Sequence, residues 1–339
     1  MRAIVVALLL MTRAVWAADF DPALVEAAKR EGAVTWYTGL IINQAARPLA
    51  EAFEVRFPGM KMAYARASNT DTTLKILNEA RARRTAADVF DVTSGIHTLL
   101  DARAVAAYPP KSAASFAPEH KDQDGYWTAS NLYFMTALYN TNLIKPEDAP
   151  KTHEDLLNPR YAGKIAWTSE MAITGPPGMI SAVLASMGEE KGMAWLKRLA
   201  ALKPAALPVS PRAVLDQVIA GEYAIGLQTY NHHVPIGTAV GAPIDWVRLN
   251  PMVGLFSLMG IVKDSPHPNA ARLFVEYVLS EEGQKVLAAA DYLPARPDVP
   301  PRVPGLRPDA WKFNVHYISP NEAKESLPKW VAIYQEVFR

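Results

Sequence analysis

The run Tyr126-Trp-Thr-Ala-Ser-Asn-Leu-Tyr-Phe-Met-Thr-Ala-Leu-Tyr139 is one long segment of aromatic, hydroxyl and apolar side chains without a proline or a glycine. Aromatic and β-branched residues favour extended backbone, and the segment is much longer than a usual strand of about five or six residues. It therefore predicts a strand that leaves one lobe and enters another. Val253–Val262 is the second long apolar run, and we expect it to cross back.

On the N-terminal side of this segment, short helix and strand patterns alternate. Asp21-Pro22 favours the start of a helix, with Asp as the N-cap and Pro at the first helical position. The β-rich run Ala33–Tyr37 follows, and further strands are predicted at Met60–Ala65 and Asp88–Val92. Such alternation is typical of α/β layers around mostly parallel strands.

The same alternation continues on the C-terminal side, so the sequence predicts an α/β fold of two lobes joined by two crossing strands. The predicted divisions are a first lobe at 18–130 plus 256–300 and a second lobe at 131–255 plus 301–339. A hinge is expected near Ser130–Phe134 and Leu255–Gly260. Strand-to-helix loops gather at the carboxyl ends of the strands, where ligands bind beside helix N-termini. The ligand cleft is therefore expected between the lobes.

The N-terminus has the pattern of a secretory signal peptide. A short apolar run, Ala3–Met11, follows Arg2, and Val15-Trp16-Ala17 ends in a small residue suited to cleavage. The run is about half as long as a membrane-spanning helix, which disfavours a retained anchor. We expect residues 1–17 to be a signal peptide and the mature protein to be periplasmic.

Composition excludes several classes of protein. The chain has 339 residues, a net charge of +1 and no cysteine. Binding to nucleic acid phosphates needs clustered Lys and Arg, so we expect no nucleic acid partner. The lack of cysteine excludes disulfides, thiolate metal sites and a cysteine nucleophile. The length favours two domains.

No catalytic motif emerges from the sequence. It contains no Gly-x-Ser-x-Gly elbow, no Walker loop, no His-Glu-x-x-His pair and no dinucleotide fingerprint. We therefore predict that the protein is not an enzyme and has no cofactor. A hydrolytic or other enzyme stays open as the least favoured alternative.

Five motifs, in this order along the chain, carry a resemblance to a known family. They are Gly-Ala-Val-Thr-Trp-Tyr-Thr-Gly at 32–39, Ala-Ala-Asp-Val-Phe at 86–90, Pro-Arg-Tyr-Ala-Gly-Lys-Ile-Ala at 159–166, Ala-Gly-Glu-Tyr-Ala-Ile-Gly-Leu at 220–227 and the helical segment at 267–284. Together they resemble the type II extracellular solute-binding proteins of ABC importers, in the branch that includes binding proteins for ferric ion, thiamine, phosphonates and sugar phosphates.

The resemblance implies a protein that grips a small-molecule ligand between its lobes by hinge closure. It implies an ABC permease and its ATPase as partners. We expect a monomer that contacts the membrane only through the permease.

The resemblance leaves the ligand open. Iron-binding members of the family use adjacent tyrosines in the second lobe and, in many, a His or Tyr in the first loop. Here Tyr230 is followed by Asn231, the first loop carries Ile41 and Ile42, and the loop after the third strand offers Thr93. We therefore predict no metal and a small organic anion, a carboxylate or a phosphorylated compound, with ferric iron as the alternative.

The predicted ligand-binding side chains carry hydroxyl, phenol, amide, imidazole or guanidinium groups: Tyr37, Thr38, Ser68, Asn69, Thr93, Ser94, Ser169, Thr174, Arg212, Tyr230, Asn231 and His232. Such groups, with helix-start N–H groups, bind carboxylate or phosphate without a metal. Helix capping explains Ser68, Asn69 and Ser94 equally well. Arg66 is a weaker candidate than Arg212.

The pair His232-His233 invites a metal interpretation. Neighbouring side chains on an extended strand point in opposite directions and do not easily share one ion. We therefore expect a single histidine, His232, to act as a hydrogen-bond donor.

Overall fold

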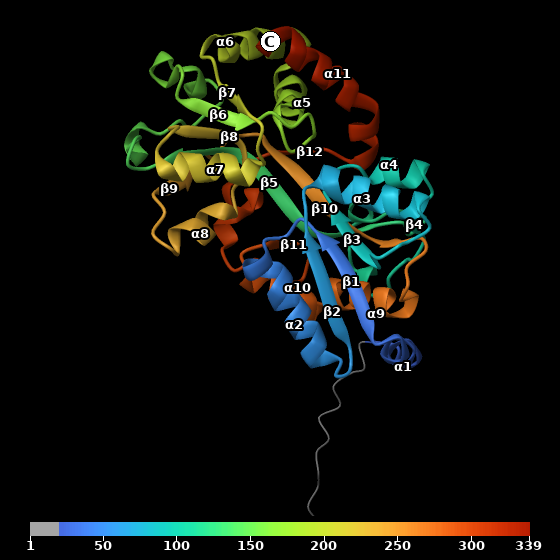
Figure 1. Ribbon diagram of the computed structural model, residues 1–339. Helices are drawn as coiled ribbons and strands as arrows, with labels where there is room; N and C mark the ends of the chain where they lie inside the picture. Colours follow the sequence, from blue (N-terminus) through green and yellow to red (C-terminus); the bar gives the residue numbers. More distant parts are fainter. Residues whose placement is uncertain (1–19) are drawn as a thin grey trace, which may run out of the picture.

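The computed structural model describes residues 20–339, which form two α/β lobes around one mixed sheet (Figure 1). The predicted signal peptide at 1–17 lies outside the described residues. Within the described part, no helix is long and apolar enough to span a membrane.

The strands of the first lobe and the two crossing strands are β1 (Ala33–Thr38), β2 (Lys61–Arg66), β3 (Val89–Val92), β4 (Val105–Ala106), β5 (Thr128–Asn140) and β10 (Met252–Val262). The other strands are β6 (Ile165–Thr168), β7 (Ala205–Leu207), β8 (Ile225–Tyr230), β9 (Ile244–Trp246), β11 (Leu293–Pro294) and β12 (Val315–Tyr317). The main path of the sheet runs β2-β1-β3-β10-β5-β8-β6-β7.

The helices around the first lobe are α1 (Pro22–Glu31), α2 (Arg47–Arg56), α3 (Asn69–Arg81), α4 (Ile96–Asp101), α9 (Pro268–Leu279) and α10 (Glu281–Ala289). Those around the second lobe are α5 (Pro176–Met187), α6 (Glu189–Ala201), α7 (Pro211–Ala220), α8 (His233–Thr238) and α11 (Pro320–Phe338). Short helical turns lie at Ile42–Ala46, Lys111–Ala113, Pro118–His120, Pro146–Asp148, Asp155–Leu157, Pro159–Tyr161, Pro304–Leu306 and Pro308–Trp311.

The antiparallel strands β5 and β10 form the connection between the lobes, which confirms the two predicted crossings. Both strands are buried along their whole length. Near one end, β10 pairs with β3 of the first lobe at Leu258–Ile261, and β5 pairs with β8 of the second lobe at Met135–Tyr139. The pairing of β5 with β10 shifts register between Ser257 and Leu258, inside the segment where we expect the hinge.

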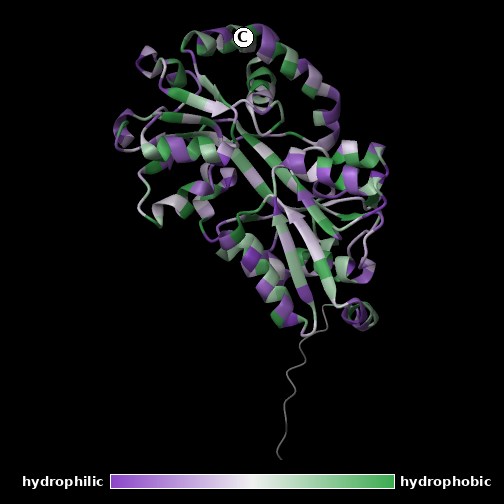
Figure 2. Cartoon of the chain, viewed as in Figure 1, coloured by the Kyte–Doolittle hydropathy of each residue, from purple (hydrophilic) through white to green (hydrophobic). Residues whose placement is uncertain are grey.

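Local signals in the sequence explain where several helices begin and end. Asp21 caps α1 by accepting a hydrogen bond from the backbone N–H of Ala23 at 2.9 Å. The helix stops at Gly32, whose φ of 74° is left-handed, a conformation that glycine adopts without strain. Hydrophobic residues follow the central strands, whereas the outer helices show mixed colours (Figure 2), as expected for helices that bury one face.

The C-terminal helix α11 lies over the second lobe and reaches toward the first (Figure 1). It packs mainly on α5 and α6. At its near end, Lys324 Nζ lies 3.1 Å from Asp101 Oδ1 on α4. The boundaries of the lobes at 18–130 plus 256–300 and 131–255 plus 301–339 stay a prediction.

Candidate ligand-binding site between the lobes

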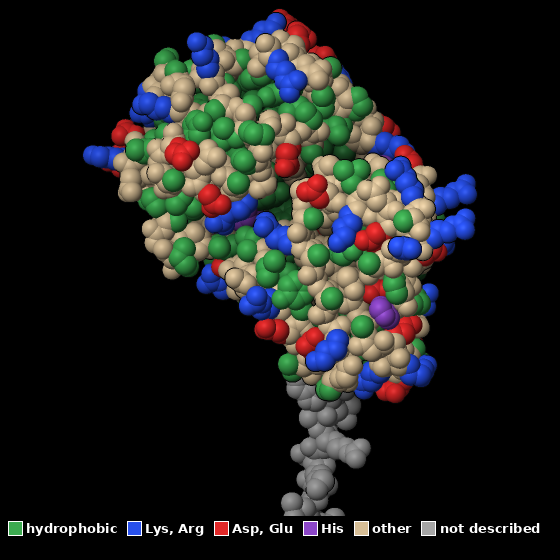
Figure 3. Space-filling view, in the orientation of Figure 1, with side chains coloured by type: hydrophobic (Ala, Val, Ile, Leu, Met, Phe, Trp, Pro, Cys, Tyr) green, Lys and Arg blue, Asp and Glu red, His purple; other side chains and the backbone are tan. Residues whose placement is uncertain are grey.

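A cavity of about 230 Å³ lies between the two lobes. Its first-lobe wall comes from the segments that follow β1, β2 and β3, and its second-lobe wall comes from the segments after β6 and β8 and the start of α7. Figure 3 shows the surface hollowed at this place, between the two halves of the molecule. The cavity therefore lies where strand-end loops of both lobes face each other, as the α/β pattern predicts.

The structure brings seven of the predicted site residues to the cavity wall. These are Ser68, Asn69, Thr93, Thr174, Arg212, Tyr230 and His232. Two of them also have local structural roles: Ser68 Oγ accepts from the N–H of Asp71 at 3.1 Å and so caps α3, and Asn69 Oδ1 accepts from the N–H of Thr93 at 2.7 Å. Both roles hold the loops after β2 and β3 in place.

Two predicted residues of the first strand, Tyr37 and Thr38, do not line the cavity. The Tyr37 hydroxyl donates to Glu79 Oε1 at 2.7 Å. Thr38 is fully buried, and its Oγ1 accepts from the N–H of Leu40 at 3.0 Å. Both side chains form hydrogen bonds within the first lobe, and Thr38 stabilises the turn after β1. The structure therefore does not place them at the cleft, contrary to the prediction.

Ser94, Ser169 and Asn231 also lie away from the cavity wall. Ser94 lines a separate apolar groove beside α4 and α11. The backbone of Ser169 extends the pairing of β6 with β7, because its N–H donates to the carbonyl of Leu207 at 2.7 Å. Asn231 is fully buried, and its Nδ2 donates to the carbonyl of Leu306 at 2.6 Å, which anchors the proline-rich C-terminal segment.

The cavity carries one arginine from each lobe. Arg66 is the last residue of β2 in the first lobe, and its Nε donates to the carbonyl of Gly39 at 3.3 Å. Arg212 is in the first turn of α7 in the second lobe, and its Nη2 lies 2.9 Å from Asp216 Oδ1. Both guanidinium groups line the cavity. Arg66, which the sequence favoured less than Arg212 as a ligand-binding residue, therefore lies in the same cavity as Arg212.

Two acidic residues that the sequence analysis missed also line the cavity. Asp91, on β3, accepts from the N–H of Gly39 at 3.2 Å and from the Ser257 hydroxyl at 3.4 Å. Burial raises the pKa of Asp91 to about 6 despite these hydrogen bonds. Glu170 lies in the loop after β6, and burial raises its pKa too. All four residues of β3 are buried, and this hides the position of Asp91, because residues of a strand buried on both faces are normally apolar.

Aromatic rings form the inner wall of the cavity. Tyr133, Tyr230, His232, His233 and Tyr292 all line it, with ring centroids of Tyr133 and Tyr230 at 4.9 Å and of His232 and Tyr292 at 4.8 Å. Tyr133 comes from β5 and Tyr292 follows α10. No local motif marks these two positions, because they come together only through the pairing of β11 with β5 at Leu293 and Leu132.

The two histidines differ from the prediction for an extended chain. The backbone of His232 is helical, with φ −66° and ψ −13°, because α8 begins at His233. Both rings therefore face the same cavity, with centroids 4.5 Å apart. Burial, together with nearby Arg212, lowers the pKa of His232 to about 3 and that of His233 well below its usual range. The histidines are neutral at neutral pH, so the arginines supply the positive charge.

The groups that could bind a hard metal ion are the phenols and imidazoles of this wall. Among the described residues, no three His, Cys, Asp or Glu side chains cluster in a way that could hold an ion. Burial raises the pKa of Tyr133 and Tyr230 far above the usual value and that of Tyr292 to about 12. The phenols are therefore protonated at neutral pH when no cation is near.

Two lobes, two crossing strands and a polar cavity between them define the class as a two-lobed ligand-binding protein of type II. Residues 90–315 match the family model described as bacterial extracellular solute-binding protein, and the chain belongs to that family. This confirms the resemblance seen in the sequence motifs.

Curated relatives and solved structures agree with this assignment. The chain is 23% identical over 239 residues to the Fe(3+)-binding periplasmic protein of Serratia marcescens, covering 68% of this chain and 69% of the relative. It is 26% identical over 189 residues to iron uptake protein A1 of Synechocystis, covering 52% and 51% of the two chains.

Among solved structures, iron-bound HitA of Pseudomonas aeruginosa superposes with a TM-score of 0.73 at 23% identity, covering 90% of this chain and 99% of that one. AfuA of Actinobacillus pleuropneumoniae with bound fructose-6-phosphate gives the same TM-score, 0.73, at 20% identity and the same coverage. These likenesses show the fold.

Proposed function

We propose that the protein is the periplasmic solute-binding component of an ABC importer and captures a small organic anion, a carboxylate or a phosphorylated compound, between its lobes. The observation that carries the proposal is the pair Arg66 and Arg212, which line one cavity from opposite lobes. An anion between two such groups attracts both lobes, so binding favours the closed form. The solute then passes to the permease with its ATPase, and the protein itself catalyses no reaction.

Helix geometry supports an anionic ligand. The helices α3 and α7 both begin at the cavity, with Ser68 and Ser210 as their N-caps. Helix N-termini carry a partial positive charge and free N–H groups, which favour carboxylate or phosphate. The first turns come from different lobes, so this attraction also acts across the cleft.

Ferric iron is the second candidate, and the three tyrosines at the cavity favour it. Phenolate oxygens are hard ligands, and a trivalent cation beside Tyr133, Tyr230 and Tyr292 would offset the burial that now keeps them protonated. The Serratia relative is named for Fe(3+) binding. The two arginines oppose a bare cation at the same place, which is why we place the anion first.

Calorimetry on metal-stripped protein separates the two candidates. The protein is titrated with a panel of organic acids and phosphate esters, and separately with ferric salts. We expect heat and a single site with at least one organic anion in the absence of iron. Heat with ferric salts alone, together with loss of that heat in Tyr230→Phe, would contradict the anion proposal and support the iron alternative.

A further inference from the structure

Among residues 20–339, Glu170 is the charged side chain of the cavity whose carboxylate has no partner on either oxygen. Arg66 and Arg212 each have a hydrogen-bonding partner within the chain, and Asp91 accepts through Oδ1 while its Oδ2 is buried without a partner among the described residues. In residues 20–339, the Glu170 carboxylate makes neither a hydrogen bond nor an ion pair, and only its backbone N–H bonds, to Thr168 Oγ1 at 3.1 Å. Its carboxylate is therefore available to a ligand.

The surroundings of Glu170 disfavour its negative charge. Partial burial raises its pKa, and Asp71, in the first turn of α3 on the facing lobe, raises it further by repulsion. Two like charges that face each other across the cleft oppose closure. A positive group of the ligand placed at Glu170 would remove this opposition.

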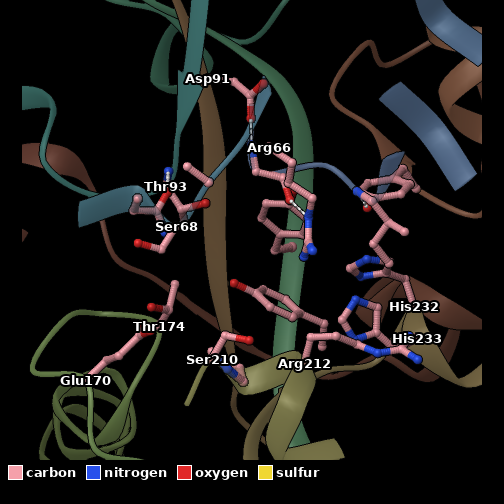
Figure 4. A pocket seen from close by; sticks show the side chains of 18 residues that line it. Arg66, Ser68, Asp91, Thr93, Glu170, Thr174, Ser210, Arg212, His232 and His233 are labelled. Atoms are coloured by element: carbon pink, nitrogen blue, oxygen red, sulfur yellow. Dashed lines mark hydrogen bonds between the residues drawn. The ribbon is translucent and has the colours of Figure 1, made fainter. Parts of the chain in front are cut away.

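Glu170 and Arg212 lie on opposite sides of the cavity, whereas Asp91 lies on the same side as Arg66 (Figure 4). In Figure 4, Glu170 and Thr174 lie on one side, and Arg212, His232 and His233 lie on the other. Burial raises the pKa of Tyr230, Glu170 raises it further, and Arg66 lowers it. A cavity of about 230 Å³ is below the roughly 300–1,000 Å³ of pockets for larger ligands, so one small molecule can contact Glu170 and both arginines.

We propose that the solute is a zwitterion, with an anionic group between Arg66 and Arg212 and an ammonium group at Glu170. This inference rests on the proposed function and narrows its ligand class. A metal ion at Glu170 is less favoured than an ammonium group, because Glu170 belongs to no cluster of three His, Cys, Asp or Glu side chains among the described residues. Glu170 is thus the residue that selects an amino-substituted anion over a plain one.

Matched pairs of ligands test the inference. Calorimetry on the metal-stripped protein compares succinate with aspartate and ethyl phosphate with phosphoethanolamine, and adds the amino counterpart of any other anion that binds. We expect the amino member of a binding pair to bind about tenfold more tightly, as a charge-assisted contact in a partly exposed site does. Glu170→Gln should weaken the amino member about tenfold but leave the plain anion unchanged or tighter, because the substitution also removes a repulsive charge.

Glu170→Gln should weaken binding of the amino member but not of the plain anion. Damage to the fold would instead weaken binding of both members of a pair and lower the thermal unfolding temperature. Glu190→Gln, at an exposed residue of α6 away from the cavity, makes the same change of net charge and should shift neither affinity. Equal affinities within a pair in the wild-type protein, or a preference that survives Glu170→Gln, would overturn the inference and leave the anion proposal intact. If no organic anion binds at all, the proposed function fails and this inference fails with it.

Discussion

Arg212 holds its position through Asp216 and presents the rest of its guanidinium group to the cavity. Arg212→Ala should weaken binding of the organic anion at least about tenfold, because a partly desolvated charge-assisted contact contributes on the order of 1.5–3 kcal/mol. Calorimetry gives the change in Kd. Arg198→Ala makes the same substitution at an exposed arginine of α6. It is the control and should leave Kd unchanged. A loss of affinity below threefold in Arg212→Ala would contradict the assignment of Arg212 as an anion contact.

Tyr230 tests a weaker contact at the same wall. Its ring packs on Tyr133, with centroids 4.9 Å apart, so Tyr230→Phe keeps the packing and removes one neutral hydroxyl. We expect a loss of anion affinity of about three- to tenfold, since a neutral hydrogen bond contributes about 0.5–1.5 kcal/mol. The same titration measures it, and a loss greater than that of Arg212→Ala would place the main anion contact on the phenol instead.

His153 gives the fold a dependence on acid. It is buried in the second lobe, and burial lowers its pKa to about 4, below the value of about 6.5 in an unfolded chain. The unfolded state binds the proton first, so stability is full above pH 6.5 and falls as the pH drops toward 4. Between pH 7 and pH 5 this histidine should lower the free energy of unfolding by about 2 kcal/mol.

Denaturant unfolding at pH 7 and pH 5 measures this difference in the wild type and in His153→Gln. The wild type should lose more stability than the variant, by roughly that amount. The buried His232 and His233 act in the same direction in both proteins and cancel in the comparison. Equal losses in the two proteins would show that His153 is not held neutral by the fold.

The site residues that could be predicted from the sequence lie at the ends of strands or the starts of helices. Ser68, Asn69 and Arg212 follow strands or begin helices, and Tyr230 ends a strand, so loop position pointed to them. Asp91, Tyr133 and Tyr292 were missed because they sit in a buried strand, in a crossing strand and after a helix, where the pattern reads as core. Tyr37 and Asn231 were predicted to bind the ligand because they are polar and lie near a loop. Their side chains instead form hydrogen bonds inside the protein.

At the scale of elements, the loop before α5 holds Glu170 and Thr174 in the cavity. A β-carbon at Gly175 would lie 2.1 Å from the backbone oxygen of Glu170, so Gly175→Ala must move the loop. We expect the variant to lower the free energy of unfolding by about 1–3 kcal/mol, the usual range for overpacking, and to weaken ligand binding.

Gly305→Ala is the matched control for the loop variant. A β-carbon there meets only Trp311 at 3.9 Å, an ordinary contact. Denaturant unfolding and calorimetry on both variants should show a loss in Gly175→Ala alone. Wild-type affinity in Gly175→Ala would mean that this loop does not position the ligand.

The elements themselves were largely predictable. The length and apolar character of the two crossing strands indicated β5 and β10, and the capping signal at Asp21-Pro22 indicated the start of α1. The start of α8 could not be predicted, because His232-His233 follows a strand directly and no side chain caps the helix there. The prediction that the side chains of His232 and His233 point in opposite directions was therefore wrong, because the chain turns from strand to helix at these residues.

At the scale of the whole molecule, the account depends on motion of the lobes about the crossing pair. The lobes are joined by β5 and β10, whose pairing is irregular at Ser257, and by the contact of α11 with α4. The cavity takes its two arginines from different lobes. A ligand that binds both arginines therefore has higher affinity for the closed form, which is the condition for a ligand to shift the equilibrium.

Small-angle X-ray scattering with and without a saturating organic anion measures closure of the lobes. We expect a smaller radius of gyration in the presence of the anion, and no change in a double variant that carries Arg66→Ala and Arg212→Ala. A scattering profile that is identical with and without bound anion, at a concentration where calorimetry shows full occupancy of the wild type, would contradict capture between closing lobes.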